Sequence, residues 1–220
     1  LGFPASLEQA LSSFGFTTML AVVALLGTAA LAAQQIGFTA LSIAFMPGFG
    51  FALAATALVG QSVGARNLGD AWKAVRIAEL WAIVWMAIGG VIYFVLAHPV
   101  MKVFTDDPEV IDDGVDALHA ISLSLPFWAI WSVNGGALRG LGDTRTPLVM
   151  SVVTVWSAVG LAYLAVTWLD GGLGMVWLTF MLTSPLGALG NRYVLRRRLQ
   201  ETRRELAESA AEPAIASSGA

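Results

Sequence analysis

The feature that most constrains this chain is a series of long segments without charged side chains. No Asp, Glu, Lys or Arg occurs between Gln9 and Ala65, a stretch of 57 residues. Four further charge-free stretches of 21 to 24 residues follow, at Leu80–Met101, Ala117–Leu138, Thr146–Leu169 and Gly171–Asn191. About 20 apolar residues in a helix span the core of a bilayer, so the first stretch suffices for two crossings and each of the others for one. The sequence therefore predicts an all-α integral membrane protein with six transmembrane helices.

The basic residues predict how these helices are oriented. Eleven of the 12 Lys and Arg residues fall in alternate connections, after the second, fourth and sixth spans, and the exception is Lys102. Positive charge accumulates in the cytoplasmic connections of membrane proteins. We therefore expect the cell membrane, inner or plasma, as the location, with both ends of the chain in the cytoplasm and membrane lipid as a partner.

Composition argues against several other classes of protein. The chain is 57% hydrophobic and only 12% charged, whereas charged residues make up about a quarter of a soluble domain. It has no cysteine, and His98 and His119 lack a third ligand, so no metal site is expected. No Ser–His arrangement, mixed His/Asp/Glu cluster or phosphate loop suggests an enzyme or a cofactor. The basic clusters are short and lie next to the spans, which argues against nucleic-acid binding.

Prolines mark expected breaks within two spans. Pro47 lies in the second span and Pro126 in the fourth. Proline removes a backbone donor and kinks a helix, and such a break survives in a bilayer only where protein or a cavity covers it. The six spans are expected at about 5–26, 30–63, 71–97, 113–138, 146–169 and 175–194. Residues 200–220 are expected to form a cytoplasmic tail, helical to about Glu208 and disordered from Ala211.

Uncharged polar and aromatic residues inside the spans are the candidates for a substrate cavity. Gln34 and Gln35 lie near the external end of the second span, and Asn134 lies in the fourth; hydrogen bonding between helices is the alternative for each. Trp128 and Trp131 follow Pro126 and can stack on a cation, although packing or interfacial placement would also explain them.

Two carboxylates, Glu8 and Glu79, lie close to the ends of predicted spans. Glu8 lies about one turn inside the cytoplasmic end of the first span. It is a reserve candidate for ion coupling, although a solvated interfacial role fits equally. Glu79 lies three residues after Arg76, so a local ion pair is expected there.

Glycine-rich segments at the cytoplasmic connections predict helix ends and close packing. Gly60 and Gly64 allow backbones to approach, and Gln61 lies between them. Gly140 and Gly142 end the fourth span, and Asp143 is expected to cap the next helix. Arg139, between them and the bilayer, serves as a topology anchor.

Several segments, in their order along the chain, resemble the C-terminal half of the multidrug and toxic compound extrusion (MATE) family. The resemblance covers about residues 1–199 and therefore sets the domain expected here. The segments are Gly2-Phe3-Pro4 with Glu8, Leu31–Ile36, Val59–Ala65, Val103–Val110 and Gly136–Pro147.

The resemblance implies one lobe of a twelve-helix, two-lobe antiporter. Such a protein exports cationic or amphipathic compounds in exchange for protons or sodium, so the expected partners are a small cationic substrate and a missing N-terminal six-helix lobe. Some sodium-coupled relatives carry carboxylates where this chain has Ser12 and Trp128. The resemblance therefore favours protons, with the essential carboxylate in the other lobe. The alternatives are a flippase of lipid-linked precursors, or a non-transporting membrane remnant.

Overall fold

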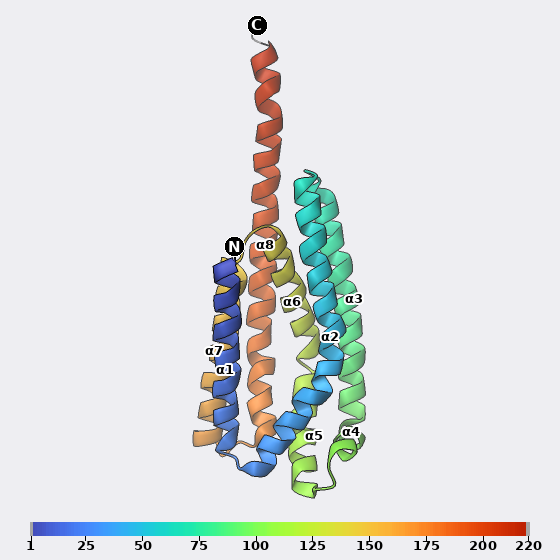
Figure 1. Ribbon diagram of the computed structural model, residues 1–220, viewed down its shortest axis with the longest axis vertical. Helices are drawn as coiled ribbons and strands as arrows, with labels where there is room; N and C mark the ends of the chain where they lie inside the picture. The colour runs from blue at the N-terminus through green and yellow to red at the C-terminus, as the bar shows by residue number, and fades with distance from the viewer. Residues whose placement is uncertain (1, 219–220) are drawn as a thin grey trace.

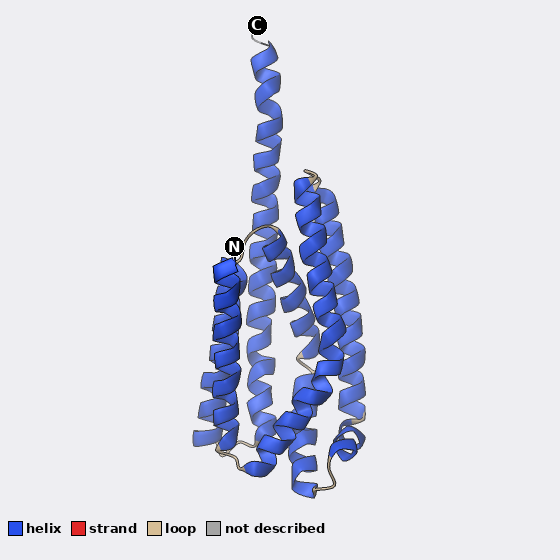
Figure 2. Ribbon diagram, viewed as in Figure 1, coloured by secondary structure: helices blue, strands red, loops and turns tan. Residues whose placement is uncertain are grey.

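In the computed structural model the chain folds into helices joined by short connections (Figures 1 and 2). The structure describes the backbone of residues 2–218 and the side chains of residues 6–204. No strand occurs in this part of the chain, and the side chains of motif residues Gly2 to Pro4 lie outside it. The helices are Gly2–Ala24 (α1), Thr28–Gly64 (α2), Leu68–Val95 (α3), Ala97–Phe104 (α4), Pro108–Ser122 (α5), Leu125–Gly140 (α6), Arg145–Trp168 (α7) and Leu173–Ser218 (α8).

Five of these helices are long and apolar enough to cross a bilayer. The qualifying stretches are Ser6–Ala24, Thr28–Gly64, Leu68–Val95, Arg145–Trp168 and Leu173–Arg204. They lie side by side, and together with α5 and α6, which return the chain between α3 and α7, they alternate in direction along the chain (Figure 1). The fourth expected span is the exception, because two consecutive shorter helices, α5 and α6, replace one continuous helix.

The break between α5 and α6 has a local cause. The helices are separated by Leu123 and Ser124, and Pro126 lies in the first turn of α6. Pro126 has no N–H to offer to the Ser122 carbonyl four residues earlier, so a continuous helix would lack this bond. Gly90 of α3 lies against the break, where an added Cβ would come 2.8 Å from the Ser122 carbonyl oxygen.

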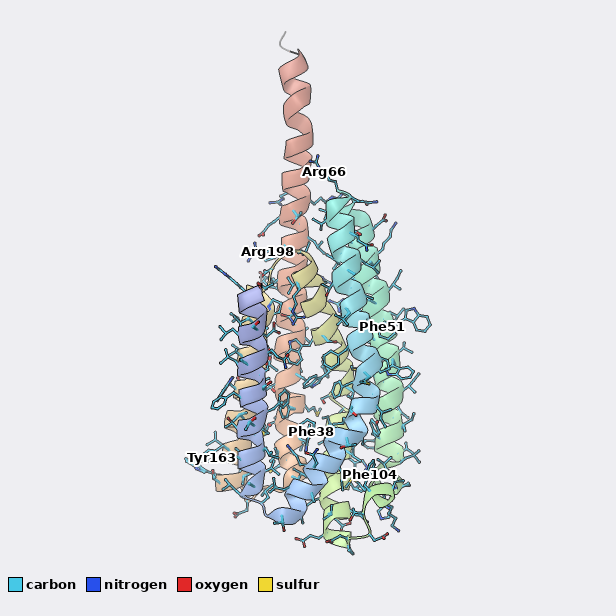
Figure 3. All side chains as sticks on the ribbon, viewed as in Figure 1. Phe38, Phe51, Arg66, Phe104, Tyr163 and Arg198 are labelled. Atoms are coloured by element: carbon cyan, nitrogen blue, oxygen red, sulfur yellow. The ribbon has the colours of Figure 1, made fainter. Side chains whose placement is uncertain are left out.

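The other intramembrane proline leaves its helix continuous. α2 runs through Pro47 without interruption, but its axis changes direction between the labelled residues Phe38 and Phe51 (Figure 3). The first half of α2 therefore crosses the bundle obliquely, and the second half runs alongside α3 (Figure 1).

The outer surface of the bundle is apolar. Met46, Leu53 and Trp168 are 79%, 71% and 80% exposed. An exposed apolar surface of this extent is unfavourable in water but is the expected lining toward hydrocarbon. The interior between the helices contains small residues instead, including Ala33, Ala55 and Ala82.

Glycines of α6 bring it into backbone contact with α2. Gly136 and Gly140 are one turn apart, and added Cβ atoms would come 2.3 Å from the Ala52 carbonyl oxygen and 2.6 Å from the Thr56 carbonyl oxygen. The Thr56 hydroxyl donates to the Gly136 carbonyl at 2.9 Å. This small-xxx-small spacing is the usual means of close packing between membrane helices.

The connection from α6 to α7 is held by a carboxylate. Gly142 takes a φ of 83°, which favours glycine. Asp143 accepts hydrogen bonds from the backbone N–H groups of Arg145 at 3.1 Å and Thr146 at 3.0 Å, as expected for a capping residue. Burial alone raises the pKa of Asp143, but hydrogen bonds from Thr146 and Arg198, and the positive charge of Arg198, lower it below its usual value.

The last helix extends further than expected. α8 continues as helix to Ser218, so the segment from Ala211, expected to be disordered, is helical over most of its length. Its alanine and glutamate residues favour helix even without packing. In Figure 1 this end of α8 projects beyond the rest of the bundle.

Most basic residues gather at one end of the bundle. Arg66 and Arg198 lie at the end where α8 leaves the bundle, whereas Phe104 and Tyr163 lie toward the opposite end (Figure 3). The start of α1 and the α6–α7 connection also lie toward the basic end (Figure 1). The connections that are rich in basic residues thus lie at one end of the bundle, and the intervening connections lie at the other end.

Candidate functional site

A cavity of about 220 Å³ lies inside the bundle. Residues of α1, α2, α6, α7 and α8, together with Met86 of α3, line it. Aromatic rings form one part of its wall and polar or charged side chains form another, a combination found in sites that bind small organic molecules. The aromatic residues on the wall are Phe16, Phe45, Phe49, Trp128 and Trp131.

The aromatic wall is organised around Trp128. Its ring centroid lies 5.1 Å from that of Phe45 and 4.8 Å from that of Trp131, with the two tryptophan rings edge to face. Trp128 and Trp131 are three residues apart on α6, so they share one face of that helix. The helix begins only at Leu125, just after the break, which sets the direction in which both rings point.

An ion pair lies on the cavity wall. Arg139 Nη2 of α6 donates to Glu8 Oε1 of α1 at 2.8 Å, and both residues line the cavity. Nearby, the hydroxyls of Ser12 and Ser151 are 3.0 Å apart and link α1 to α7. The cavity therefore has a charged portion, with opposite charges that compensate each other, in addition to its aromatic wall.

Two buried polar atoms of lining residues have no hydrogen-bond partner among the described residues. They are Trp128 Nε1, a donor, and Asn191 Oδ1, an acceptor. The amide nitrogen of Asn191 is satisfied, because it donates to the Trp131 carbonyl at 3.2 Å. Buried unpaired polar groups are uncommon and unfavourable, and these two belong to residues of the cavity wall.

Three of the residues expected on a substrate cavity lie elsewhere. Gln34 is buried, with Oε1 unpaired among the described residues, while Gln35 is exposed on the bundle surface; neither lines this cavity. Asn134 is also buried and donates to Glu79 and to the Ile130 carbonyl. Successive helix residues point about 100° apart, so only some of the polar residues along a span can face a given cavity.

A second ion pair, which sequence spacing did not suggest, joins α3 to α8. Arg192 Nη1 donates to Glu79 Oε1 at 2.8 Å, and the Glu79 side chain is only 7% exposed. Asn134 Nδ2 donates to the same oxygen at 3.2 Å. The expected pair with Arg76 is therefore replaced by one across 113 positions. The sequence offered one indication of this pair, because Glu79 lies at the end of one apolar span and Arg192 lies at the end of another.

No metal site is evident in residues 6–204. These residues contain no group of three or more His, Cys, Asp or Glu that could hold a metal ion. His119 Nε2 lies 3.0 Å from the Phe94 carbonyl oxygen, so this histidine is engaged with the backbone of α3.

Comparison with known sequences identifies relatives along most of the chain. The sequence model of the family described as MatE matches residues 4–164. The probable multidrug resistance protein NorM of Thermotoga maritima is 31% identical over 179 residues, which cover 81% of this chain. The multidrug resistance protein NorM of Burkholderia vietnamiensis is 28% identical over 196 residues. The chain spans 39% and 42% of the length of these two proteins.

Solved structures share the fold. A MOP superfamily transporter from Pyrococcus furiosus superposes with a TM-score of 0.86 at 21% identity, over 92% of this chain and 46% of its own. An inward-facing multidrug resistance MATE family transporter gives a TM-score of 0.83 over 93% of this chain and 48% of its own. The bundle thus corresponds to about half of each of those structures.

Proposed function

This chain belongs to the MatE family, and on that premise we propose that it forms the C-terminal six-helix lobe of an antiporter that exports cationic or amphipathic compounds. A second six-helix lobe would complete the transport pathway. The order of the segments that resemble the family supports assignment to the C-terminal half. The relatives named as multidrug resistance proteins support the class of substrate.

The observation that carries this proposal is the chemistry of the cavity. Trp128 and Trp131 line it, with Glu8 among the other lining residues. Aromatic faces attract cations and pack well against flat apolar groups. A lining of this kind suits a range of amphipathic cations better than one defined polar substrate.

The same cavity argues against a flippase for pyrophosphate-linked lipids. Such a protein needs net positive charge where the phosphates bind. Arg139 is the only basic residue among the cavity-lining side chains in residues 6–204, and Glu8 neutralises it. A doubly charged phosphate group would therefore meet no uncompensated cation here.

We propose protons as the coupling ion and place the essential carboxylate in the other lobe. Ion coupling needs a group whose charge or ligation changes as access alternates, and a carboxylate within the membrane is the usual choice. Ser12 and Trp128 stand where sodium-coupled relatives carry carboxylates, and Ser12 is engaged with the Ser151 hydroxyl. Glu8 and Glu79, the two carboxylates considered above, already have arginine partners.

The test is efflux of a fluorescent organic cation by the full-length transporter in sealed vesicles, with Trp131→Ala compared with Trp168→Ala. Trp168 is 80% exposed on the outer surface, which makes it a matched control for loss of one tryptophan. We expect Trp131→Ala to raise the half-saturating concentration about tenfold, because tenfold corresponds to about 1.4 kcal/mol and a partly desolvated cation–aromatic contact contributes about 1–2 kcal/mol, while Trp168→Ala has little effect. Equal effects of the two substitutions would contradict a role for the cavity in substrate binding.

The driving ion is tested with the same vesicles. An imposed pH gradient should drive efflux without sodium, and a sodium gradient alone should not. Efflux that requires sodium and ignores the pH gradient would contradict proton coupling but leave the substrate proposal intact.

A further inference from the structure

A basic groove lies at the end of the bundle from which α8 projects. It has a volume of about 850 Å³ and runs between the α2–α3 connection, the start of α3, and α8. Arg66 lies on the α2–α3 connection, close to the extension of α8 in the view of Figure 3. The basic side chains that line the groove are Arg66, Lys73, Arg196 and Arg203.

The positive charge of this groove is poorly compensated. No carboxylate is among its lining residues within 6–204. Lys73 lies 3.7 Å from Asp70, but both side chains are more than half exposed, so solvent weakens this pair. Within the part of the chain whose side chains are described, Arg66 and Arg196 form no ion pair. The groove is therefore an attractive site for an anion.

The groove also has an apolar floor. Leu68, Trp72 and Leu199 line it beside the basic groups. Leu199 is buried, with 8% of its surface exposed. The Arg196 guanidinium lies 5.8 Å from the centre of the Trp72 ring. Tryptophan and arginine together are typical of the level of lipid headgroups, where one part of the ligand is charged and the next is apolar.

The backbone at Arg66 provides an independent observation. Arg66 has a φ of 58°, and α2 ends there with Arg66 N–H bonded to the Val63 carbonyl and Asn67 N–H bonded to the Ser62 carbonyl. Glycine is the usual residue at this position of such a helix end, since other residues are strained with positive φ. The chain has an arginine at this strained position, and its side chain lines the groove.

We propose that this groove binds the headgroup of an anionic phospholipid of the membrane leaflet that it faces. The four basic residues hold the phosphate, and Trp72, Leu68 and Leu199 pack against the glycerol and the first methylenes of the acyl chains. A free phosphate ion would use the cations but gain nothing from the apolar floor. The groove lies at the basic end of the bundle, where α2 ends and α3 begins, and basic residues at the ends of apolar helices lie at the level of the lipid headgroups. The proposal does not depend on the transported substrate.

The experiment counts lipids bound to the full-length protein in an uncharged detergent by native mass spectrometry. Phosphatidylglycerol, phosphatidylcholine and inorganic phosphate are titrated separately. Phosphatidylglycerol should bind in a saturable manner, and the other two should bind much more weakly. Arg203→Gln should weaken phosphatidylglycerol binding about fivefold, the effect expected of one basic residue near an anionic membrane surface.

Two variants distinguish binding in the groove from nonspecific attraction of anionic lipid to the basic end of the bundle. Arg204→Gln removes the same charge from the same helix, but Arg204 does not line the groove, so it should leave binding nearly unchanged. Arg66→Gly relieves the backbone strain and should keep or raise thermal stability while weakening phosphatidylglycerol binding. Equal effects of Arg203→Gln and Arg204→Gln, or equal binding of inorganic phosphate or phosphatidylcholine, would overturn the proposal.

Discussion

Glu8 Oε1 and Arg139 Nη2 lie 2.8 Å apart and join α1 to α6 across 131 positions of the sequence. The Glu8 side chain is 13% exposed and that of Arg139 is 37% exposed, so the pair is partly open to solvent. The carboxylate considered as a reserve for ion coupling is thus held by a fixed cation. Its role in this arrangement is to connect two helices and to cancel the charge of Arg139 on the cavity wall.

For Glu8→Gln we expect a small loss of stability, below about 1 kcal/mol, because partly exposed ion pairs contribute little. Efflux driven by a pH gradient should remain largely intact. Both quantities are measured on the full-length protein, by thermal unfolding in detergent and by vesicle transport. If folded Glu8→Gln protein loses coupled transport, the coupling site belongs to this lobe and the assignment to the other lobe is wrong.

Breaking the Glu79–Arg192 pair should be more damaging. Glu79 is nearly buried and shares its oxygen with Asn134, so Glu79→Ala leaves both Asn134 and the Arg192 side chain, which is 34% exposed, without their acceptor. We expect a loss of roughly 1–2 kcal/mol, between the values for exposed and for buried pairs because solvent reaches Arg192, and a smaller loss for the double change Glu79→Leu with Arg192→Met. Asp70→Ala, at an exposed pair, is the control and should change the unfolding midpoint little. A similar midpoint for Glu79→Ala and Asp70→Ala would contradict the buried pair.

Gly136→Ala tests the contact between α6 and α2. The added methyl would meet the Ala52 carbonyl oxygen at 2.3 Å, so the helices must separate, and we expect a loss of about 1–3 kcal/mol from overpacking. Gly50 lies on α2 with nothing within 4 Å of an added Cβ. Gly50→Ala should therefore be neutral or stabilising by up to about 1 kcal/mol through helix propensity. Reversal of this order in thermal unfolding would refute the close approach.

Asp143→Asn tests the cap of α7 through its pH dependence. Because the folded pKa of Asp143 is depressed, the stabilisation by its ionised form is present above the unfolded pKa of about 3.9 and is lost as pH falls through the folded pKa. Asn caps a helix about as well as Asp, so the loss at pH 7 comes from the removed charge at the start of α7 and beside Arg198, about 0.5–1 kcal/mol, and it should shrink below about pH 4. A constant difference from pH 7 to pH 3 would show that the charge of Asp143 contributes nothing.

Orientation in the membrane is tested by labelling. The chain has no cysteine, so single cysteines report cleanly within it. Cysteines at Asn67 and Thr144, at the basic end, should be protected from an impermeant thiol reagent in intact cells, whereas those at Asp107 and Gly172 should react, because basic connections remain in the cytoplasm. The opposite pattern would reverse the orientation.

The sequence by itself determined the class of the protein, the number of membrane crossings and the alternation of its connections between the two ends of the bundle. These properties depend on hydrophobic length and on charge along the chain, both of which are local. The Asp143 cap and the helix end at Gly142 were equally accessible, because a turn is built from neighbouring residues. Pro126 marked the fourth span as broken, but only the structure located the break at Leu123 and Ser124.

The tertiary structure decided which polar residues meet. Nothing in the spacing of Glu8, Arg139, Glu79 and Arg192 reveals that the four form two pairs between distant helices. The rotation of each helix about its axis determines whether a side chain faces the cavity, another helix or lipid, and packing between helices sets that rotation. For this reason Trp128 and Trp131 line the cavity. Gln34 and Asn134, which also lie within predicted spans, are buried elsewhere in the bundle.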